Sequence, residues 1–116
     1  MFDHIGIRVS DLAASVRIYR AMLEPLGFVL DDSGSGFGPK GEPALWLVAS
    51  SEPSGAHVAL KAPNRKAVDQ FYKAALAAGA KDNGAPGLRA DYSPTYYAAF
   101  VIDRDGNNIE AVTFTG

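Results

Sequence analysis

Two stretches of the chain alternate between apolar residues and other residues, and each leads directly into a helical pattern. The alternating apolar positions are Ile5, Ile7 and Val9 in the first stretch and Val58, Leu60 and Ala62 in the second. Such alternation predicts half-buried strands. Apolar residues then recur with the 3.6-residue period of an amphipathic helix, at Leu12, Val16, Tyr19 and Leu23 and at Val68, Phe71, Tyr72, Ala75 and Leu76.

The ends of the two helices and the later strands are marked by short local signals. Ser10 or Asp11 precedes the first helix, Pro63 and Asn64 precede the second, and glycine follows both helices where a left-handed cap is favoured. Strand-like runs then cover residues 28–30, 35–38 and 44–49, and later residues 80–82, 96–102 and 107–114. Residues 103–107 predict a hairpin turn, whereas residues 83–95 predict a long loop that acts as a lid or binding segment.

The two halves of the chain are related by an internal repeat. A shift of 53 residues aligns His4 with His57 and Tyr19 with Tyr72 without a gap. We therefore predict a duplication with repeats 1–53 and 54–116 inside a single domain, residues 1–116. Each half reads as βαβββ, so the expected fold is α+β, with two modules forming a cup-shaped, roughly eight-stranded mixed sheet and the helices outside it.

Composition excludes several classes of function. The 116 residues suffice for one globular domain and contain no cysteine, which removes disulfides, thiolate nucleophiles and cysteine metal sites. With a net charge of −2, the chain lacks the excess of basic residues that is typical of a nucleic-acid-binding protein. The longest apolar run, residues 96–102, is far shorter than the ~20 residues of a membrane helix, and no signal-peptide pattern opens the chain. We expect a cytoplasmic protein with no nucleic-acid or membrane partner.

Strand alternation places the candidate site residues on the face of the sheet opposite the helices. His4 and His57, the two histidines of the chain, share that face, and Glu110 lies in an apolar strand where an unpartnered carboxylate is costly. Two imidazoles and one carboxylate are the ligands of the 2-His-1-carboxylate facial triad. The alternative is a metal-free pocket in which Glu110 pairs with Arg8 or Lys61.

These residues lie in motifs that resemble the vicinal oxygen chelate superfamily, which includes glyoxalases, bleomycin-resistance proteins and dioxygenases. The resemblance covers essentially the whole chain. Its motifs are residues 3–12 (DHIGIRVSDL), residues 57–60 (HVAL) and residues 100–110 (FVIDRDGNNIE). Arg104 stands where the last motif normally has proline, a change confined to the turn. The superfamily contains unrelated reactions and also proteins without catalytic activity, so the motifs are more specific for the fold than for an activity.

The resemblance implies one divalent metal ion, with His4, His57 and Glu110 at the family's ligand positions. The fourth ligand position of some members falls by internal symmetry on Trp46, which cannot coordinate a metal. Three protein ligands would leave positions for water or substrate, as in a catalytic site. Such ligands suit Zn, Ni, Mn or Fe(II). The resemblance also makes a homodimer plausible.

Other residues are candidates for contact with a small-molecule substrate or ligand. Arg8 and Lys61 could form a positive rim for an anionic substrate, or instead extend from strand ends into solvent. In glyoxalase-like relatives, an arginine four residues after the first histidine contacts a ligand carboxylate, which favours Arg8. The remaining binding candidates are Trp46, Arg89 and Tyr92.

Proton transfer would fall to Glu110 if it leaves the metal, to a bound hydroxide, or to a tyrosine such as Tyr92 or Tyr97. Tyr96 and Tyr97 are adjacent, so only one of them faces the cup, and the sequence leaves open which one.

Two functions remain open from the sequence. The first is a metal-dependent lyase or dioxygenase acting on a small oxygen-chelating substrate, which the two histidines and Glu110 favour. The second is a non-catalytic protein that sequesters a small molecule, as bleomycin-resistance proteins do, which Trp46 at the missing ligand position favours.

Overall fold

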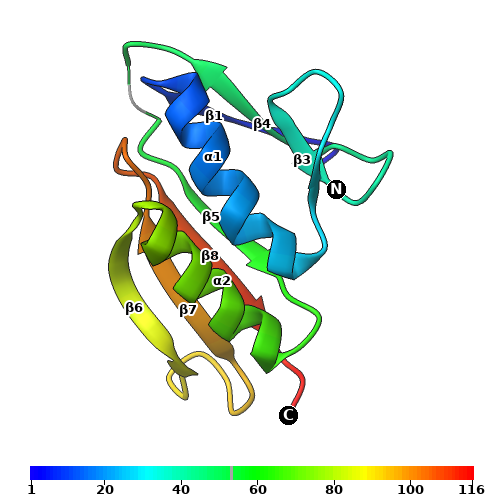
Figure 1. Cartoon of the computed structure of the whole chain (residues 1–116). Coiled ribbons are helices and arrows are strands. Elements are labelled where there is room, and N and C mark those ends of the chain that lie inside the picture. The colour runs from blue at the N-terminus through cyan, green and yellow to red at the C-terminus, as the bar shows by residue number, and fades with distance from the viewer. Residues whose placement is uncertain (53) are drawn as a thin grey trace.

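The computed structural model describes residues 1–52 and 54–116, and consists of helices packed on one side of two β-sheets (Figure 1). In chain order the elements are β1 (Ile5–Val9), α1 (Leu12–Leu23), the 3₁₀ turn η1 (Glu24–Leu26), β2 (Val29–Leu30), β3 (Gly36–Gly38), β4 (Leu45–Ala49), β5 (His57–Lys61), α2 (Arg65–Ala78), β6 (Lys81–Leu88), β7 (Tyr97–Ile102) and β8 (Asn108–Thr113). Within the described residues, none of the helices has the length and apolar character needed to cross a membrane.

Both sheets have the same strand order. The first sheet is ordered β1-β4-β3-β2 and the second β5-β8-β7-β6. In each sheet the first and last strands of the module pair in parallel, and the other neighbours pair antiparallel. This shared topology confirms the predicted α+β fold of two βαβββ modules, although the strands form two four-stranded sheets rather than one continuous sheet. The expected boundary between the repeats, residue 53, lies outside the described residues.

The predicted cap residues begin both helices. The Asp11 side chain accepts a hydrogen bond from the Ala14 backbone N–H at 3.0 Å, and the Asn64 side chain accepts one from the Ala67 N–H at 2.8 Å. These bonds satisfy N–H groups that have no partner within the helix. Gly79 ends α2 with a φ of 116°, a conformation that glycine adopts without steric cost.

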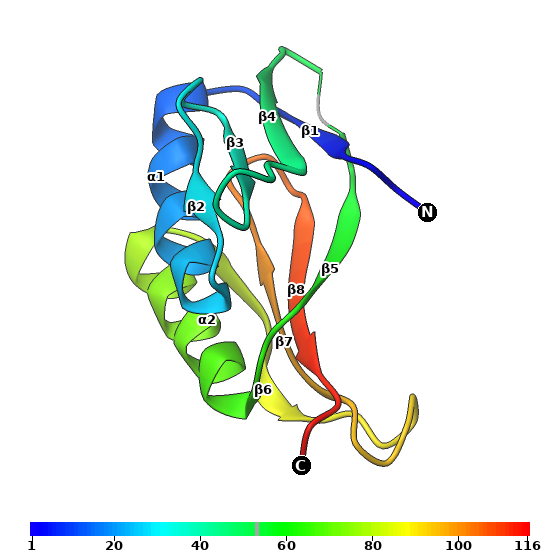
Figure 2. The same ribbon diagram turned by 90° about the vertical axis from the view of Figure 1, so that its right-hand side faces the viewer.

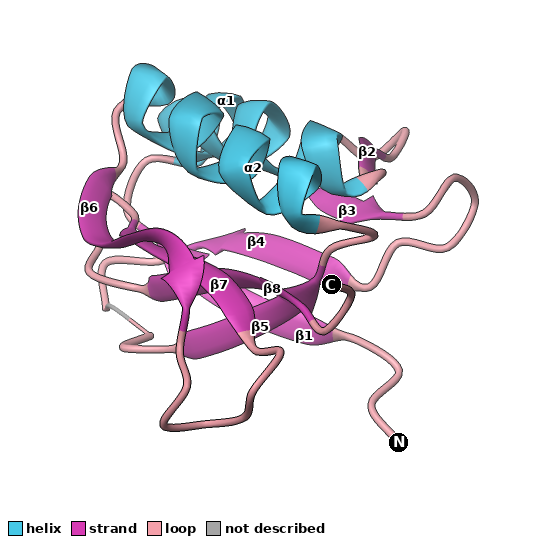
Figure 3. Ribbon diagram, turned by 90° about the horizontal axis from the view of Figure 1, so that it is seen from below, coloured by secondary structure: helices cyan, strands magenta, loops and turns pink. Residues whose placement is uncertain are grey.

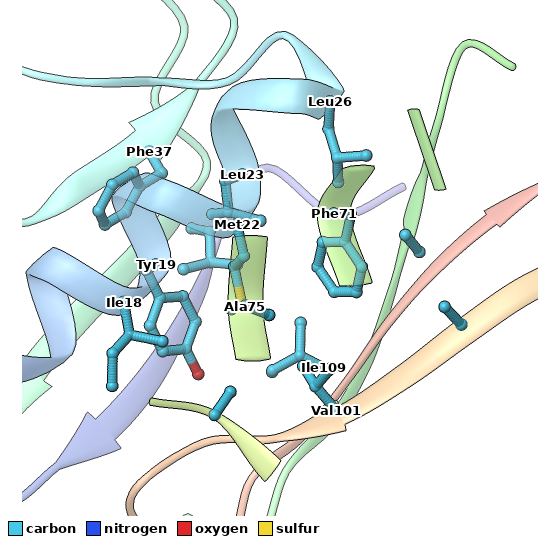
Figure 4. Close-up of a cluster of buried hydrophobic side chains, with 14 of the residues drawn as sticks. Ile18, Tyr19, Met22, Leu23, Leu26, Phe37, Phe71, Ala75, Val101 and Ile109 are labelled. Carbon is cyan, nitrogen blue, oxygen red and sulfur yellow. The ribbon is translucent and has the colours of Figure 1, made fainter. Parts of the chain in front are cut away.

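The core lies between the helices and the sheets. Figures 2 and 3 show α1 and α2 side by side over one face of the strands, with the opposite face left without helices. The close-up in Figure 4 shows side chains from α1, α2 and the second sheet meeting in this layer. Its largest fully buried members include Tyr19, Phe37, Phe71, Met22 and Ile109. The candidate site residues predicted on the other face are therefore separate from this core.

The first part of the predicted loop at residues 83–95, residues 83–88, is in fact part of a strand. β6 extends to Leu88 and pairs with β7 through two register shifts, one between Asp82 and Gly84 and one between Gly84 and Gly87. β6 is the edge strand of its sheet, where glycine, proline and bulges are tolerated. The prediction failed because these residues interrupt the alternation that identifies a strand in sequence.

The turn between β7 and β8 joins the two modules through a buried polar network. Asp103, 4% exposed, accepts hydrogen bonds from the Tyr19 hydroxyl of α1 at 2.6 Å and from the Asn107 side-chain amide at 2.9 Å. Its other oxygen accepts from the backbone N–H groups of Asp105 and Asn107. Asn107 in turn accepts from the Ala56 N–H at 3.0 Å. The turn motif therefore has a structural role: it is the joint that connects the two modules.

Tyr19 should make the stability of the protein sensitive to alkaline pH. Burial raises the pKa of its phenol well above the usual value, and the Asp103 carboxylate raises it further. The unfolded chain releases this proton near pH 10 while the folded protein keeps it, so the free energy of unfolding falls as pH rises above that value. This single group contributes ~1.4 kcal/mol per pH unit. Urea unfolding at about pH 9 and about pH 11 should show that Tyr19→Phe loses this part of the slope; an unchanged slope would contradict the assignment.

Candidate functional site

The candidate site is centred on Glu110, in the middle of β8 on the face opposite the helices. Its neighbours across the sheet are Ala59 of β5 and Phe100 of β7. The side chain is only 2% exposed, yet its Oε1 lies 3.0 Å from Nε2 of His57, which is 54% exposed. The other oxygen, Oε2, accepts a short hydrogen bond from the Tyr96 hydroxyl. Glu110 thus bridges a half-buried phenol and an exposed imidazole.

In the structure Glu110 does not pair with Arg8 or Lys61, the two partners of the metal-free alternative. The Arg8 side chain donates to the backbone carbonyl of Glu52 at 3.1 Å, and its backbone N–H donates to the Ser54 hydroxyl. Lys61 is exposed at the end of β5, opposite Val112. Within the described residues, the buried carboxylate of Glu110 therefore has no lysine or arginine partner.

The two adjacent tyrosines lie on opposite sides of the second sheet. Tyr96 reaches Glu110, whereas the Tyr97 hydroxyl donates to Asp69 of α2 at 2.6 Å beneath the Arg65 guanidinium. The structure therefore brings Tyr96 to the site and directs Tyr97, the tyrosine named from the sequence, to the helix layer. Burial raises the pKa of Tyr96 to about 12, and its hydrogen bond to Glu110 adds to the shift. Tyr96 remains a protonated donor at neutral pH.

His4 lies near His57 without joining the Glu110 network. Both histidines line one groove on the open face, with a volume of about 440 Å³, formed where β1 and β5 approach each other. The Nδ1 atom of His4 lies 2.7 Å from the neighbouring Asp3 carboxylate, and its side chain is 62% exposed. No three acidic, histidine or cysteine side chains converge as a metal cluster in the part of the chain that the structure describes. The structure thus gathers two of the three expected ligands.

Trp46 occupies the position in the first module that corresponds to Glu110 in the second. It pairs with Gly6 of β1 as Glu110 pairs with Ala59 of β5, so the register agrees with the symmetry inferred from sequence. On its other side Trp46 pairs with Gly36 of β3. The indole covers this glycine so closely that a Cβ there would lie 2.6 Å from the ring.

Gly36→Ala should displace the Trp46 ring, and the matched variant Gly6→Ala should leave it in place. A Cβ at Gly6 would meet only Val48, at an ordinary contact distance of 3.9 Å. Trp46 is the only tryptophan, so its emission spectrum reports on this one position. We expect a shift of the emission maximum in Gly36→Ala and none in Gly6→Ala. Equal spectra for both variants would show that the ring does not rest on Gly36.

Aromatic side chains form a wall beside Glu110. Tyr92 packs edge-on against Tyr96 with ring centroids 4.9 Å apart, and Phe114 packs against the same ring at 5.3 Å. Phe100 lies 6.4 Å from the His57 ring. The Arg89 guanidinium covers Phe100 at 5.4 Å from its centroid. The predicted binding residues Tyr92 and Arg89 therefore both belong to the surroundings of Glu110.

Comparison with known proteins places this architecture in a family. The model of the Glyoxalase/Bleomycin resistance protein/Dioxygenase superfamily matches residues 1–111. The chain belongs to this superfamily. A search of curated proteins found no match. The superfamily description covers several activities, so the reaction of this member has to be argued from its own site.

Solved structures show the same fold across nearly the full length of the chain. A glyoxalase/bleomycin resistance protein from Albidiferax ferrireducens T118 is 27% identical, with a TM-score of 0.78 and 97% of each chain covered. A family enzyme from Burkholderia phytofirmans PsJN is 21% identical, with a TM-score of 0.74 and coverage of 97% of this chain and 98% of the other. A putative glyoxalase from Bacillus halodurans is 24% identical, with a TM-score of 0.69 and coverage of 97% and 94%.

The superfamily resemblance implies a divalent metal, and the donor atoms of this chain can be tested against that requirement. Two neighbouring ligand atoms on one ion, each about 2.1 Å from it, lie about 3.0 Å apart in an octahedral site and about 3.4 Å apart in a tetrahedral one. The 3.0 Å between His57 Nε2 and Glu110 Oε1 fits the first of these spacings. A buried carboxylate that has no lysine or arginine partner among the described residues also suits a cation. The third expected ligand, His4, lines the same groove and would have to turn away from Asp3.

Proposed function

We propose that this protein is a divalent-metal-dependent enzyme of the lyase or dioxygenase type that acts on a small oxygen-chelating substrate. The observation that carries the proposal is the pairing of the buried Glu110 carboxylate with His57 at 3.0 Å, with no lysine or arginine on Glu110 among the described residues. His57 and Glu110 would hold the ion, with His4 as the third ligand. A bound Zn, Ni, Mn or Fe(II) ion supplies Lewis-acid stabilisation of developing negative charge on substrate oxygens.

Tyr96 is the residue that positions Glu110 for this role. Its hydroxyl donates to Oε2 and leaves Oε1 directed at His57. Because its pKa is raised to about 12, Tyr96 keeps its proton at neutral pH and continues to donate. Glu110 is the group in this network that can accept a proton from a substrate. Tyr97 takes no part, because its hydroxyl is bound to Asp69 on the helix side.

The groove between β1 and β5 supplies the space for a substrate. Its volume of about 440 Å³ is in the range of small-molecule sites. Ile5, Val58 and Leu60 contribute apolar lining, and His4 and His57 contribute polar groups. This combination of apolar walls and a few polar groups is typical of sites for small ligands.

A non-catalytic protein that binds and sequesters a small molecule is the second candidate. The specific observation in its favour is the aromatic wall of Tyr92, Tyr96 and Phe114, together with Trp46 where other members place a metal ligand. Tyr92 is 65% exposed and Phe114 49% exposed, so both rings are accessible to a ligand. Such a protein would bind its ligand equally well without metal.

Ligand binding with and without metal separates the two candidates. Catechol is a suitable probe because its two neighbouring oxygens chelate divalent cations. Isothermal titration calorimetry should show catechol binding to the Zn²⁺-loaded protein at least about tenfold more tightly than to the EDTA-treated protein. Equal affinity in both states would reject the metal enzyme and leave the sequestering protein.

A further inference from the structure

The Arg89 side chain lies over a part of β6 where two residues are glycines, so that no side chains occupy the space beneath it. Its Nη2 donates to the Ala85 carbonyl at 2.7 Å. A Cβ at Gly84 would lie 3.2 Å from Nη2, and a Cβ at Gly87 would lie 3.0 Å from Nη1. The absence of these two side chains therefore allows the guanidinium to lie against β6, the strand that precedes Arg89.

This guanidinium lies on the same side of the second sheet as the candidate site. It covers Phe100, with the arginine Cζ 5.4 Å from the ring centroid. Phe100 pairs with Gly84 on one side and with Glu110 on the other, and its ring is tilted towards the His57 ring at 6.4 Å. Arg89 and the pair of His57 and Glu110 thus lie on opposite sides of one phenylalanine.

Most of the hydrogen-bonding capacity of Arg89 is unused. A guanidinium has five N–H groups in a fixed plane and is always charged in proteins. Within residues 1–52 and 54–116, the Arg89 side chain donates one hydrogen bond, to Ala85, and has no carboxylate partner. The side chain is half-buried, and its cation–π contact with Phe100 restricts its orientation. An oriented, unpaired guanidinium suits a planar carboxylate with two parallel hydrogen bonds.

We propose that Arg89 binds the carboxylate of the substrate, so that the ligand class is a small, flat carboxylate that extends across Phe100. That its other end reaches His57 and Glu110 rests on the proposed function, whereas the anion site itself does not. The proposal adds a specificity requirement: a neutral molecule of the same shape should bind more weakly than the carboxylate.

Arg65, at the start of α2, provides a matched control. Its guanidinium lies over Tyr97 at 4.9 Å, but on the helix side of β7, and its Nε donates to the Thr115 carbonyl. Arg65→Gln therefore removes the same charge and the same kind of aromatic contact away from the proposed site.

The test compares benzoate with benzamide, its neutral analogue of similar shape, in EDTA-treated protein. NMR titration to about 20 mM should show benzoate binding at least about tenfold more tightly than benzamide to the wild type. Arg89→Gln should remove the preference, Arg65→Gln should keep it, and Arg89→Lys should keep only part of it. Equal binding of both probes to the wild type, no benzoate binding, or a preference that survives in Arg89→Gln would each overturn the proposal.

A second variant keeps the proposal testable if Arg89→Gln does not fold. Arg89→Lys is the milder change: it keeps the positive charge but lacks the planar pair of N–H groups, so it should weaken benzoate binding and leave benzamide binding unchanged. An unchanged affinity for benzoate would overturn the proposal.

The titrations in EDTA also separate this inference from the proposed function. A preference for benzoate that depends on Arg89, in a protein that takes up no metal, would retain the anion site and reject the metal enzyme. Metal uptake without that preference would reject the anion site at Arg89 and leave the metal enzyme in place.

Discussion

Asp103→Ala should lower the free energy of unfolding by about 3 kcal/mol or more, because it removes the acceptor for four hydrogen bonds at once. The Tyr19 hydroxyl and the Asn107 amide would be left without their acceptor in the interior. The turn would also lose the bonds that hold it against α1. Urea unfolding followed by circular dichroism measures the effect.

Asp91→Ala is the control for this prediction. Asp91 is exposed, so its replacement removes the same charge without disturbing a buried network. We expect a change within ±0.5 kcal/mol for this variant. If Asp103→Ala were as mild as Asp91→Ala, the turn would not be the joint between the two modules.

Glu110→Gln should reduce metal affinity by about a hundredfold or more while leaving the fold intact. The amide keeps the size of the side chain and can still accept from Tyr96, but it removes the anionic ligand. Since the carboxylate is buried without a lysine or arginine partner among the described residues, its neutralisation should leave the free energy of unfolding unchanged or raise it. Competition against a chelator gives the affinity, and urea unfolding gives the stability.

Glu42→Gln is the matched control for the metal experiment, because Glu42 is exposed in the turn before β4. It should bind metal as the wild type does. A Glu110→Gln protein that retained wild-type affinity would remove Glu110 from the metal site. A large loss of stability would instead indicate that the charge of Glu110 serves the fold.

The elements near the site could be predicted because their sequence patterns are local. Alternation identified β1 and β5, and the repeat placed Trp46 and Glu110 at related positions. The nearness of His57 to Glu110 followed from the two-module fold, and the 3.0 Å contact agrees with it. Local periodicity was sufficient here because each strand has one buried face.

Two contacts between distant segments were not predicted, although the sequence held a signal for one of them. The choice between Tyr96 and Tyr97 depends on the pairing of Phe100 with Glu110 across the hairpin. The 103–107 turn, which was predicted, sets that register, so counting back from Glu110 could have selected Tyr96. The buried bond from Tyr19 to Asp103 joins residues 84 positions apart and left no local signal.

The most direct test of the central claim is the metal content of the protein prepared without a His-tag. The protein would be stripped with a chelator, dialysed against micromolar Zn, Ni, Mn or Fe(II), and analysed by mass spectrometry of the bound metal. We predict about one ion per chain for at least one of these metals, and loss of that ion in His57→Ala. A wild-type protein that takes up none of the four metals would contradict the account.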